Sequence, residues 1–150
     1  MNKNNYAKLK INSLRRQQDY PAIDKIIGSI DADNFAKLID IAGLGSNPRE
    51  SKANKVTEAI IETLEKSPEL LVFKSKGLLI STSKCIVTDS HENIQISFVD
   101  DNHEGILDGG HNMLAIALFI LKKVLNDEKK IKRIKSFNDF LERKTFSHYI

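Results

Sequence analysis

The sequence predicts an α+β fold, in which a small mixed sheet packs against helices within a single domain over residues 1–150. Apolar residues recur with helical spacing in the first half of the chain, whereas short apolar or alternating runs typical of strands begin near Leu70. Nine consecutive apolar residues at 113–121 then predict a central helix that protein covers on nearly every side.

Three helices are expected in the first half of the chain. Residues 1–20 form a basic amphipathic segment that can be helical, and Pro21 ends it. A second helix begins near Asp31, and a third runs from Ser51 to Glu65 with Ser51 as its N-cap. The apolar stripe of this third helix consists of Val56, Ile60, Ile61 and Leu64.

Short strands follow, and turn-forming residues between them favour mostly antiparallel pairing. The predicted strands cover residues 71–73, 77–80, 85–87, 94–99 and 104–107. The central helix then runs from about residue 112 to 126. A basic helical segment over residues 122–144 is the last element that the sequence predicts.

Composition points to a soluble chain in a reducing compartment. The hydrophobic fraction is 41% and the charged fraction 29%, as in folded soluble proteins. A single cysteine, Cys85, predicts neither an internal disulfide nor a thiolate zinc site. The first twenty residues lack an apolar stretch, and the run at 113–121 is too short to span a bilayer. We therefore expect a cytoplasmic protein without membrane partners.

The net charge of +3 is unevenly distributed. Residues 1–20 hold five Lys or Arg against one acid, and residues 122–144 hold nine against four. Two basic ends around an acidic body suit a polyanionic partner such as nucleic acid. The alternative is that both ends are solvated helix faces.

The turn from Asp108 to His111, between the last strand and the central helix, is the first candidate for a functional site. A helix N-terminus attracts anions through unpaired N–H groups and the helix dipole. Gly109 and Gly110 permit positive φ angles and leave room for a phosphate, while His111 can donate a hydrogen bond or act as an acid or base. Asp108 can hold a ribose hydroxyl or a metal ion, orient His111, or cap the helix. For the two glycines, helix packing alone is the alternative.

A divalent-ion site is a further alternative, because carboxylate-rich turns beside a phosphate suit magnesium. Its ligands would come from Asp100, Asp101, His103 and Asp108. His103 and His91 are otherwise expected to be solvated turn residues.

The segment from Ile106 to His111, followed by an Ala/Ile/Leu-rich helix, resembles the Asp-Gly-Gln-His-Arg (DGQHR) signature of the family named after it, which includes regulators of DNA phosphorothioation. It is also similar to the Gly-Gly-Cys-His-Arg turn of sulfiredoxin and to the strand-turn-helix nucleotide site of ParB partition proteins. These families share the ParB/sulfiredoxin-like fold. The resemblance therefore implies that fold and a turn that binds nucleotide phosphates.

A second resemblance lies upstream of the turn. Asn47-Pro48-Arg49, a helix and the strand at 77–80 follow one another as in abortive-infection phage-resistance (AIPR) proteins. Together the two resemblances cover about residues 44 to 121. They imply a domain of a bacterial or phage-related defence or DNA-modification system.

The chain departs from these families at the turn. Asn112 stands where the related signatures carry Arg, and Gly110 stands where sulfiredoxin keeps its catalytic Cys. Sulfiredoxin chemistry is therefore not expected. Arg49, Lys74 or Lys76 can supply the missing positive charge from across the site.

The function expected from these features is binding of a nucleotide or nucleic-acid phosphate. The phosphate-binding candidates are Gly109, Gly110, His111, Asn112 and Arg49. Hydrolysis stays open, with His111 and Asp108 as the catalytic candidates and a nucleotide with Mg²⁺ as the cofactor. A homo-oligomer or a larger defence assembly is compatible with this function. The alternative is a non-catalytic regulator that binds DNA or a protein through the basic terminal segments.

Overall fold

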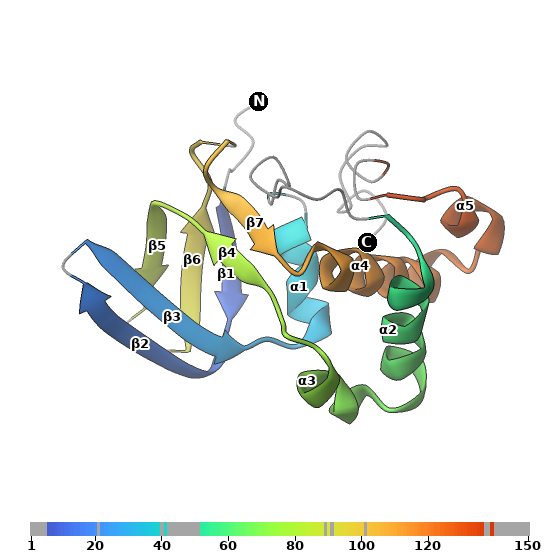
Figure 1. Cartoon of the computed structure of the whole chain (residues 1–150), viewed down its shortest axis with the longest axis horizontal. Coiled ribbons are helices and arrows are strands. Elements are labelled where there is room, and N and C mark those ends of the chain that lie inside the picture. The colour runs from blue at the N-terminus through green and yellow to red at the C-terminus, as the bar shows by residue number, and fades with distance from the viewer. Residues whose placement is uncertain are drawn as a thin grey trace.

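The computed structural model describes residues 6–20, 22–39, 41, 52–88, 90, 92–100, 102–136 and 139. Figure 1 shows the strands on one side of the molecule and α2, α3 and α5 on the other. The elements in chain order are β1 (Tyr6–Lys10), β2 (Asn12–Tyr20), β3 (Ile23–Ser29), α1 (Ala32–Ile39), α2 (Lys55–Lys66), the 3₁₀ turn η1 (Pro68–Leu70), α3 (Leu71–Lys74), β4 (Leu79–Ser81), β5 (Lys84–Val87), β6 (Asn93–Ser97), β7 (Gly105–Asp108), α4 (Gly110–Leu125) and α5 (Glu128–Lys132). These elements confirm the predicted α+β class.

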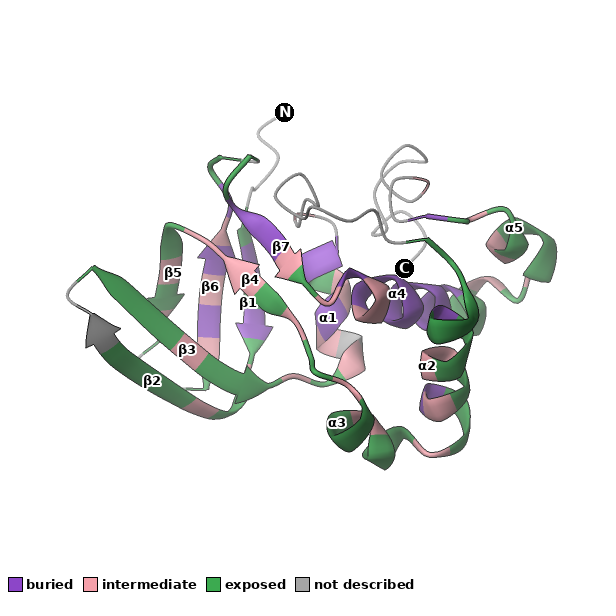
Figure 2. Ribbon diagram, in the orientation of Figure 1, coloured by how far each residue is buried: buried purple, intermediate pink, exposed green. Residues whose placement is uncertain are grey.

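Strands β1, β6 and β5 form an antiparallel sheet in that order. Burial alternates along β1 and β6, as Figure 2 shows, because successive strand residues point to opposite faces. The inner face carries Ala7 and Leu9 of β1 with Ile94 and Ile96 of β6, all buried in the core to which α1 and α4 contribute. The helix predicted over residues 1–20 is therefore wrong. Ala7 and Leu9 are two residues apart, a strand period, and pairing with β6 is what buries them.

Two more antiparallel pairs complete the strands of the described residues, the β2–β3 hairpin and the β4–β7 pair. Strand β2 continues the extended structure through the second half of the segment for which a helix was predicted. Every strand pairing in the described residues is antiparallel, so the chain forms small antiparallel sheets where the sequence predicts a mixed one.

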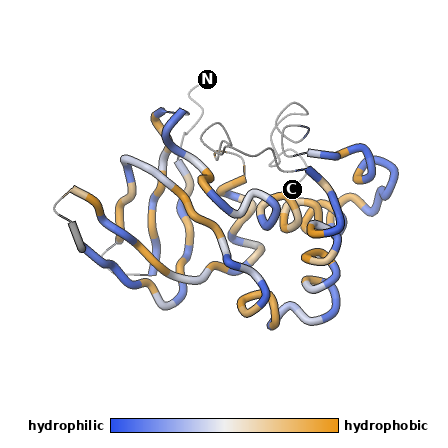
Figure 3. Tube along the Cα trace, in the orientation of Figure 1, coloured by the Kyte–Doolittle hydropathy of each residue, from blue (hydrophilic) through white to orange (hydrophobic). Residues whose placement is uncertain are grey.

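The long helix α4 forms the centre of the core, as predicted. All nine residues from Met113 to Leu121 are buried. Figure 3 shows this helix as a continuous hydrophobic stretch, and both α1 and α2 pack against it. The burial of α4 fixes the position of its N-terminus, where β7 delivers the chain.

Helix α2 begins later than predicted. Its N-cap is Asn54, which accepts hydrogen bonds from the backbone N–H groups of Val56 and Thr57 at 2.9 and 3.2 Å. The predicted cap, Ser51, lies outside the described residues. Val56 is 55% exposed and so does not belong to the buried stripe, whereas the polar Thr57 is buried. Thr57, and not Val56, is therefore the residue of the first turn that faces the core.

The strand predicted at residues 71–73 is wrong, because these residues belong to the short helix α3. Pro68 opens a 3₁₀ turn that continues directly into α3, since its fixed φ suits the first position of a helical turn. Val72 and Phe73 are 68% and 84% exposed. These two residues thus stay outside the core, whereas the half-buried Leu71 packs against it.

The basic segment predicted at residues 122–144 is helical only in part. Residues 122–125 end α4, Asn126 has a left-handed φ of +45°, and α5 ends at Lys132. Residues beyond 136, apart from Asp139, lie outside the described part of the chain. The predicted exposure of its cations is confirmed for Lys129, Lys130, Lys132, Arg133 and Lys135. None of the helices in the described residues is long and apolar enough to cross a membrane.

Candidate functional site

The turn between β7 and α4, residues 108–112, is built around one left-handed glycine. Gly109 is the N-cap of α4 and has a φ of +88°. Gly110 is the first residue of the helix and is buried, so the positive φ expected there is wrong. Asp108 accepts a hydrogen bond from the N–H of Gly109 on Oδ1 at 2.8 Å. This bond goes to the N-cap residue itself, so the side chain of Asp108 does not cap the first-turn N–H groups of α4.

Gly109 also lies against the segment that leads into β4. An ideal Cβ placed on it would lie 2.3 Å from the carbonyl oxygen of Gly77 and 2.8 Å from Cδ2 of Leu78. Both the φ angle and the close approach therefore require glycine at this position. The packing of two backbone segments is the first reason for this residue type here.

Asn112 holds the same two segments together. Its side-chain Nδ2 donates a hydrogen bond to the carbonyl oxygen of Gly77 at 2.8 Å. The N–H of Gly77 is in turn bound by the hydroxyl oxygen of Ser75 at 3.0 Å. The residue that replaces Arg of the related signatures is thus a clamp between α4 and the start of β4.

His111 reaches the N-terminus of α2. Its Nε2 lies 3.2 Å from Nδ2 of Asn54, and its side chain is half-buried. No hydrogen bond joins His111 to Asp108 within the described residues. The partner that orients this imidazole is therefore Asn54, which the sequence reasoning missed because the two residues are 57 positions apart.

The cap of α2 decides which atom of Asn54 faces His111. Because Oδ1 of Asn54 accepts from the N–H groups of Val56 and Thr57, its amide NH₂ is the group turned toward the imidazole. Nε2 of His111 must then be the acceptor. This geometry fits the tautomer that carries its proton on Nδ1, in which Nδ1–H is the donor left for a ligand.

The first turn of α4 presents backbone donors. The N–H groups of Gly110, His111 and Asn112 have no hydrogen-bond partner in the part of the chain that the structure describes. An α-helix leaves these groups unpaired unless a side chain caps them, and Gly109 has none. The turn therefore combines backbone donors, the positive end of a helix of 16 residues and one imidazole.

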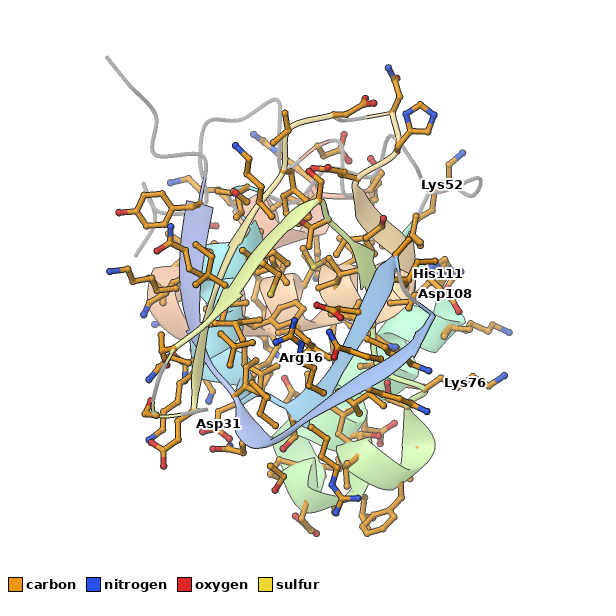
Figure 4. All side chains as sticks on the ribbon, turned by 90° about the vertical axis from the view of Figure 1, so that its left-hand side faces the viewer. Arg16, Asp31, Lys52, Lys76, Asp108 and His111 are labelled. Carbon is orange, nitrogen blue, oxygen red and sulfur yellow. The ribbon has the colours of Figure 1, made fainter. Side chains whose placement is uncertain are left out.

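Two lysines flank the turn. Figure 4 shows Lys52, His111, Asp108 and Lys76 along one edge of the molecule. Their positions in the chain agree, since Lys52 lies two residues before Asn54 and Lys76 directly precedes Gly77, the two residues that contact α4. Both lysines are exposed.

The other proposed cations do not join them. Arg49 lies outside the described residues. Lys74 interacts with Glu62 on α2 instead. The hydrogen bond from Lys66 lowers the pKa of Glu62, and the charge of Lys74 lowers it further. Lys76 is thus the one cation of the original three that the described residues place beside the turn.

The carboxylate-rich loop before β7 does not form a metal site in the described residues, which contain no group of three or more potential ligands. Asp101 and His91 lie outside them. Asp100 pairs with His103, whose Nδ1 lies 2.7 Å from Oδ2. This bond and one from the N–H of Asn102 lower the pKa of Asp100, so its carboxylate is engaged within the loop.

Glu104 is a buried acid whose role the sequence did not reveal. Its two carboxylate oxygens accept from the N–H groups of Ser83 and Val99 at 3.0 and 2.6 Å. These hydrogen bonds, that from Ser83 first, lower the pKa of Glu104. The side chain ties the β4–β5 connection to the loop before β7, and this places β7 and the turn.

Within the turn Asp108 is exposed, Gly110 is buried, and His111 and Asn112 are half-buried. One hollow of the molecule lies on the β1–β6–β5 sheet and one between α2 and α3. Neither of these two hollows is lined by a residue of the turn.

Comparison of the chain with protein-family models, curated proteins and solved structures gives no match. The resemblance to the ParB/sulfiredoxin-like families therefore stays a prediction from the motifs.

Proposed function

We propose that the chain binds a phosphate group of a nucleotide or nucleic acid at the N-terminus of α4. The observation that carries the proposal is the uncapped first turn of this helix, in which His111 is the second residue. Backbone N–H groups at a helix N-terminus point at a ligand and, with the helix dipole, form a ready-made site for a phosphate.

The donors are fixed before a ligand arrives. Gly109 packs on Gly77, Asn112 is bonded to the same residue, and α4 is buried along most of its length. Asn54 holds the imidazole of His111. Little conformational freedom is lost on binding, which leaves more of the interaction energy for affinity.

The charge balance favours a phosphate that carries a cation. Lys52 and Lys76 are positive, but the exposed carboxylate of Asp108 opposes an anion. Mg²⁺ fits this arrangement, because it is held in many proteins by one or two carboxylates together with phosphate oxygens. Oδ1 of Asp108 is bonded to Gly109, so Oδ2 is the oxygen suited to the ion.

Binding is proposed without a catalytic step. His111 faces Asn54 and has no hydrogen bond to Asp108 in the described residues, so these residues do not form an acid–base pair.

Calorimetric titration with AMP, ADP and ATP, each with and without Mg²⁺, tests the proposal. We expect His111→Ala to weaken binding by about 1.5–3 kcal/mol, the range for a hydrogen bond to a charged group. His103→Ala is the matched control, because His103 is exposed and paired with Asp100 away from the turn. Gly110→Val is a poorer test, since Gly110 is buried and the variant can fail to fold. Equal affinities of folded His111→Ala and the parent would reduce the turn to a packing device.

A second candidate function is a regulator that binds DNA through α5 and the residues after it. The observation in its favour is the exposure of five cations between residues 129 and 135. Acids on the same helix offset two of them, at 3.6 Å for Lys130 with Asp127 and 3.8 Å for Lys132 with Glu128. DNA binding that weakens with salt, in a protein that binds no nucleotide, would favour this function.

A further inference from the structure

The outer face of the β1–β6–β5 sheet has a composition that the linear sequence hides. Residues directly opposite on paired strands point to the same face, so the pairing registers define this surface. We call it the outer sheet face. It consists of Tyr6, Lys8 and Lys10 of β1, Asn93, Gln95 and Ser97 of β6, and Lys84 and Ile86 of β5.

This face is positively charged. It carries three exposed lysines, Lys8, Lys10 and Lys84, and no carboxylate among its eight residues. Lys8 and Lys10 are about 7 Å apart along β1, and Lys84 lies across the central strand from Tyr6. Apart from the hydroxyl of Tyr6, the remaining polar groups are the two amides and one hydroxyl of β6, between the charged strands. A polyanion therefore meets attraction along the whole face.

An aromatic ring lies in the same surface. Tyr6 is 39% exposed and Ile86 is 61% exposed. The lining of one surface hollow includes Tyr6, Lys84, Ile86, Gln95 and Ser97. The sheet stands at the side of the molecule away from α2 and α5 (Figure 1), the side toward which Figure 4 looks.

We propose that the outer sheet face binds single-stranded nucleic acid. Proteins that bind single strands combine cations that follow the phosphates with aromatic side chains on which bases stack. Lys8, Lys10 and Lys84 supply the cations, and Tyr6 supplies the stacking surface. A duplex offers its phosphates but keeps its bases stacked inside, so it would leave Tyr6 without a partner. Asn93 and Gln95 lie on β6, between the strands that carry Tyr6 and Lys84. Their amides are suited to hydrogen-bond base edges or sugar oxygens.

This inference goes beyond the phosphate site at α4, with which the outer sheet face shares no residue. It also places Lys8 and Lys10 of the basic N-terminal segment on the surface of a sheet, where the sequence predicted a helix. The two sites are tested by separate substitutions, so either proposal can fail alone.

The experiment measures fluorescence polarisation of labelled oligonucleotides of about 15 nucleotides, within the range that one small sheet-based domain covers. Oligodeoxythymidylate and oligouridylate distinguish DNA from RNA, and a mixed-sequence duplex is the third probe. Tyr6→Ala is expected to weaken single-strand binding roughly 5- to 150-fold, as loss of one stacked base does. Tyr6→Phe, which keeps the ring, should bind within about twofold of the parent.

The lysines are tested by salt dependence. Replacing Lys8, Lys10 and Lys84 by Gln together should reduce the slope of log affinity against log salt by about 2, since each single-strand contact contributes about 0.7. Lys37→Gln, an exposed lysine on α1, is the control and should leave the slope unchanged. Failure of the parent to bind either single strand would overturn the inference. It would equally be overturned by unchanged affinity of Tyr6→Ala, or by a duplex that binds as tightly as the single strands.

Discussion

The close approach of Gly109 to Gly77 makes a quantitative prediction about stability. Both glycines have left-handed backbones, with φ of +88° and +76°. A Cβ on Gly109 would lie 2.3 Å from the carbonyl oxygen of Gly77, whereas one on Gly77 would have nothing within 4 Å. Alanine at the two positions therefore meets the same backbone strain, and only at Gly109 does it also meet a steric clash.

The expected losses of unfolding free energy follow from these two terms. A left-handed backbone costs an alanine about 1–2 kcal/mol relative to the right-handed form. The lower entropy of the unfolded alanine chain offsets about 0.4–1 kcal/mol. Gly77→Ala should therefore destabilise the fold by about 0–1.6 kcal/mol. Gly109→Ala should lose about 1–3 kcal/mol more, the usual cost of overpacking, because a backbone carbonyl cannot rotate away as a side chain can.

Urea unfolding followed by far-ultraviolet circular dichroism measures both variants. Comparing them removes the shared strain and isolates the contact between β7–α4 and the segment before β4. Equal destabilisation of the two variants would refute the argument, because it would show that the turn moves aside at no cost. A Gly109→Ala protein as stable as the parent would refute it as well.

Three further predictions test individual contacts. Asn54→Asp keeps the acceptor that caps α2 but removes the donor to His111, so the ring proton should move from Nδ1 to Nε2, as ¹⁵N NMR of the imidazole can show; a parent ring already protonated on Nε2 would contradict the structure. The pKa of Glu104 is lowered from 4.5 by its hydrogen bonds, so its carboxylate stabilises the fold above about pH 4.5, and this contribution is lost as pH falls through the lowered value. As the pH is lowered below about 4.5, the urea midpoint of Glu104→Gln should therefore fall less than that of the parent. Parallel curves of urea midpoint against pH for the two proteins would exclude the effect. Cys85 is half-buried on β5 and burial raises the pKa of its thiol, so Cys85→Ala should keep nucleotide binding and the parent should react slowly with iodoacetamide; loss of binding in a folded variant would assign the thiol a function.

The sequence predicted correctly those elements whose signal is local and strong. Nine consecutive apolar residues cover every side of a helix, so they predict a helix that is buried on all sides. The nine residues of α4 are buried. Strands β4 to β7 were expected from short runs between turn residues, and their approximate positions are confirmed. The cations between residues 129 and 135 were expected to face solvent because one helix cannot bury them all, and they do.

The wrong predictions fall where local patterns are ambiguous. Residues 6–20 contain few apolar residues, and these fit a helical or a strand period equally well over so short a segment. Pairing of β1 with β6, more than 80 residues away, decides in favour of strands. Residues 71–73 read as a strand by composition, yet Pro68 starts a helical turn there.

By itself, then, the sequence determined the α+β class, the buried helix and the glycine turn before it. Only the tertiary structure decided that Asn54 faces His111, that Gly109 lies on Gly77, and that lysines of β1 and β5 share one surface with Tyr6. The physical reason is that hydrophobic periodicity and turn chemistry act between neighbours in the chain, whereas hydrogen-bond partners and charged surfaces depend on strand register and helix packing between distant segments.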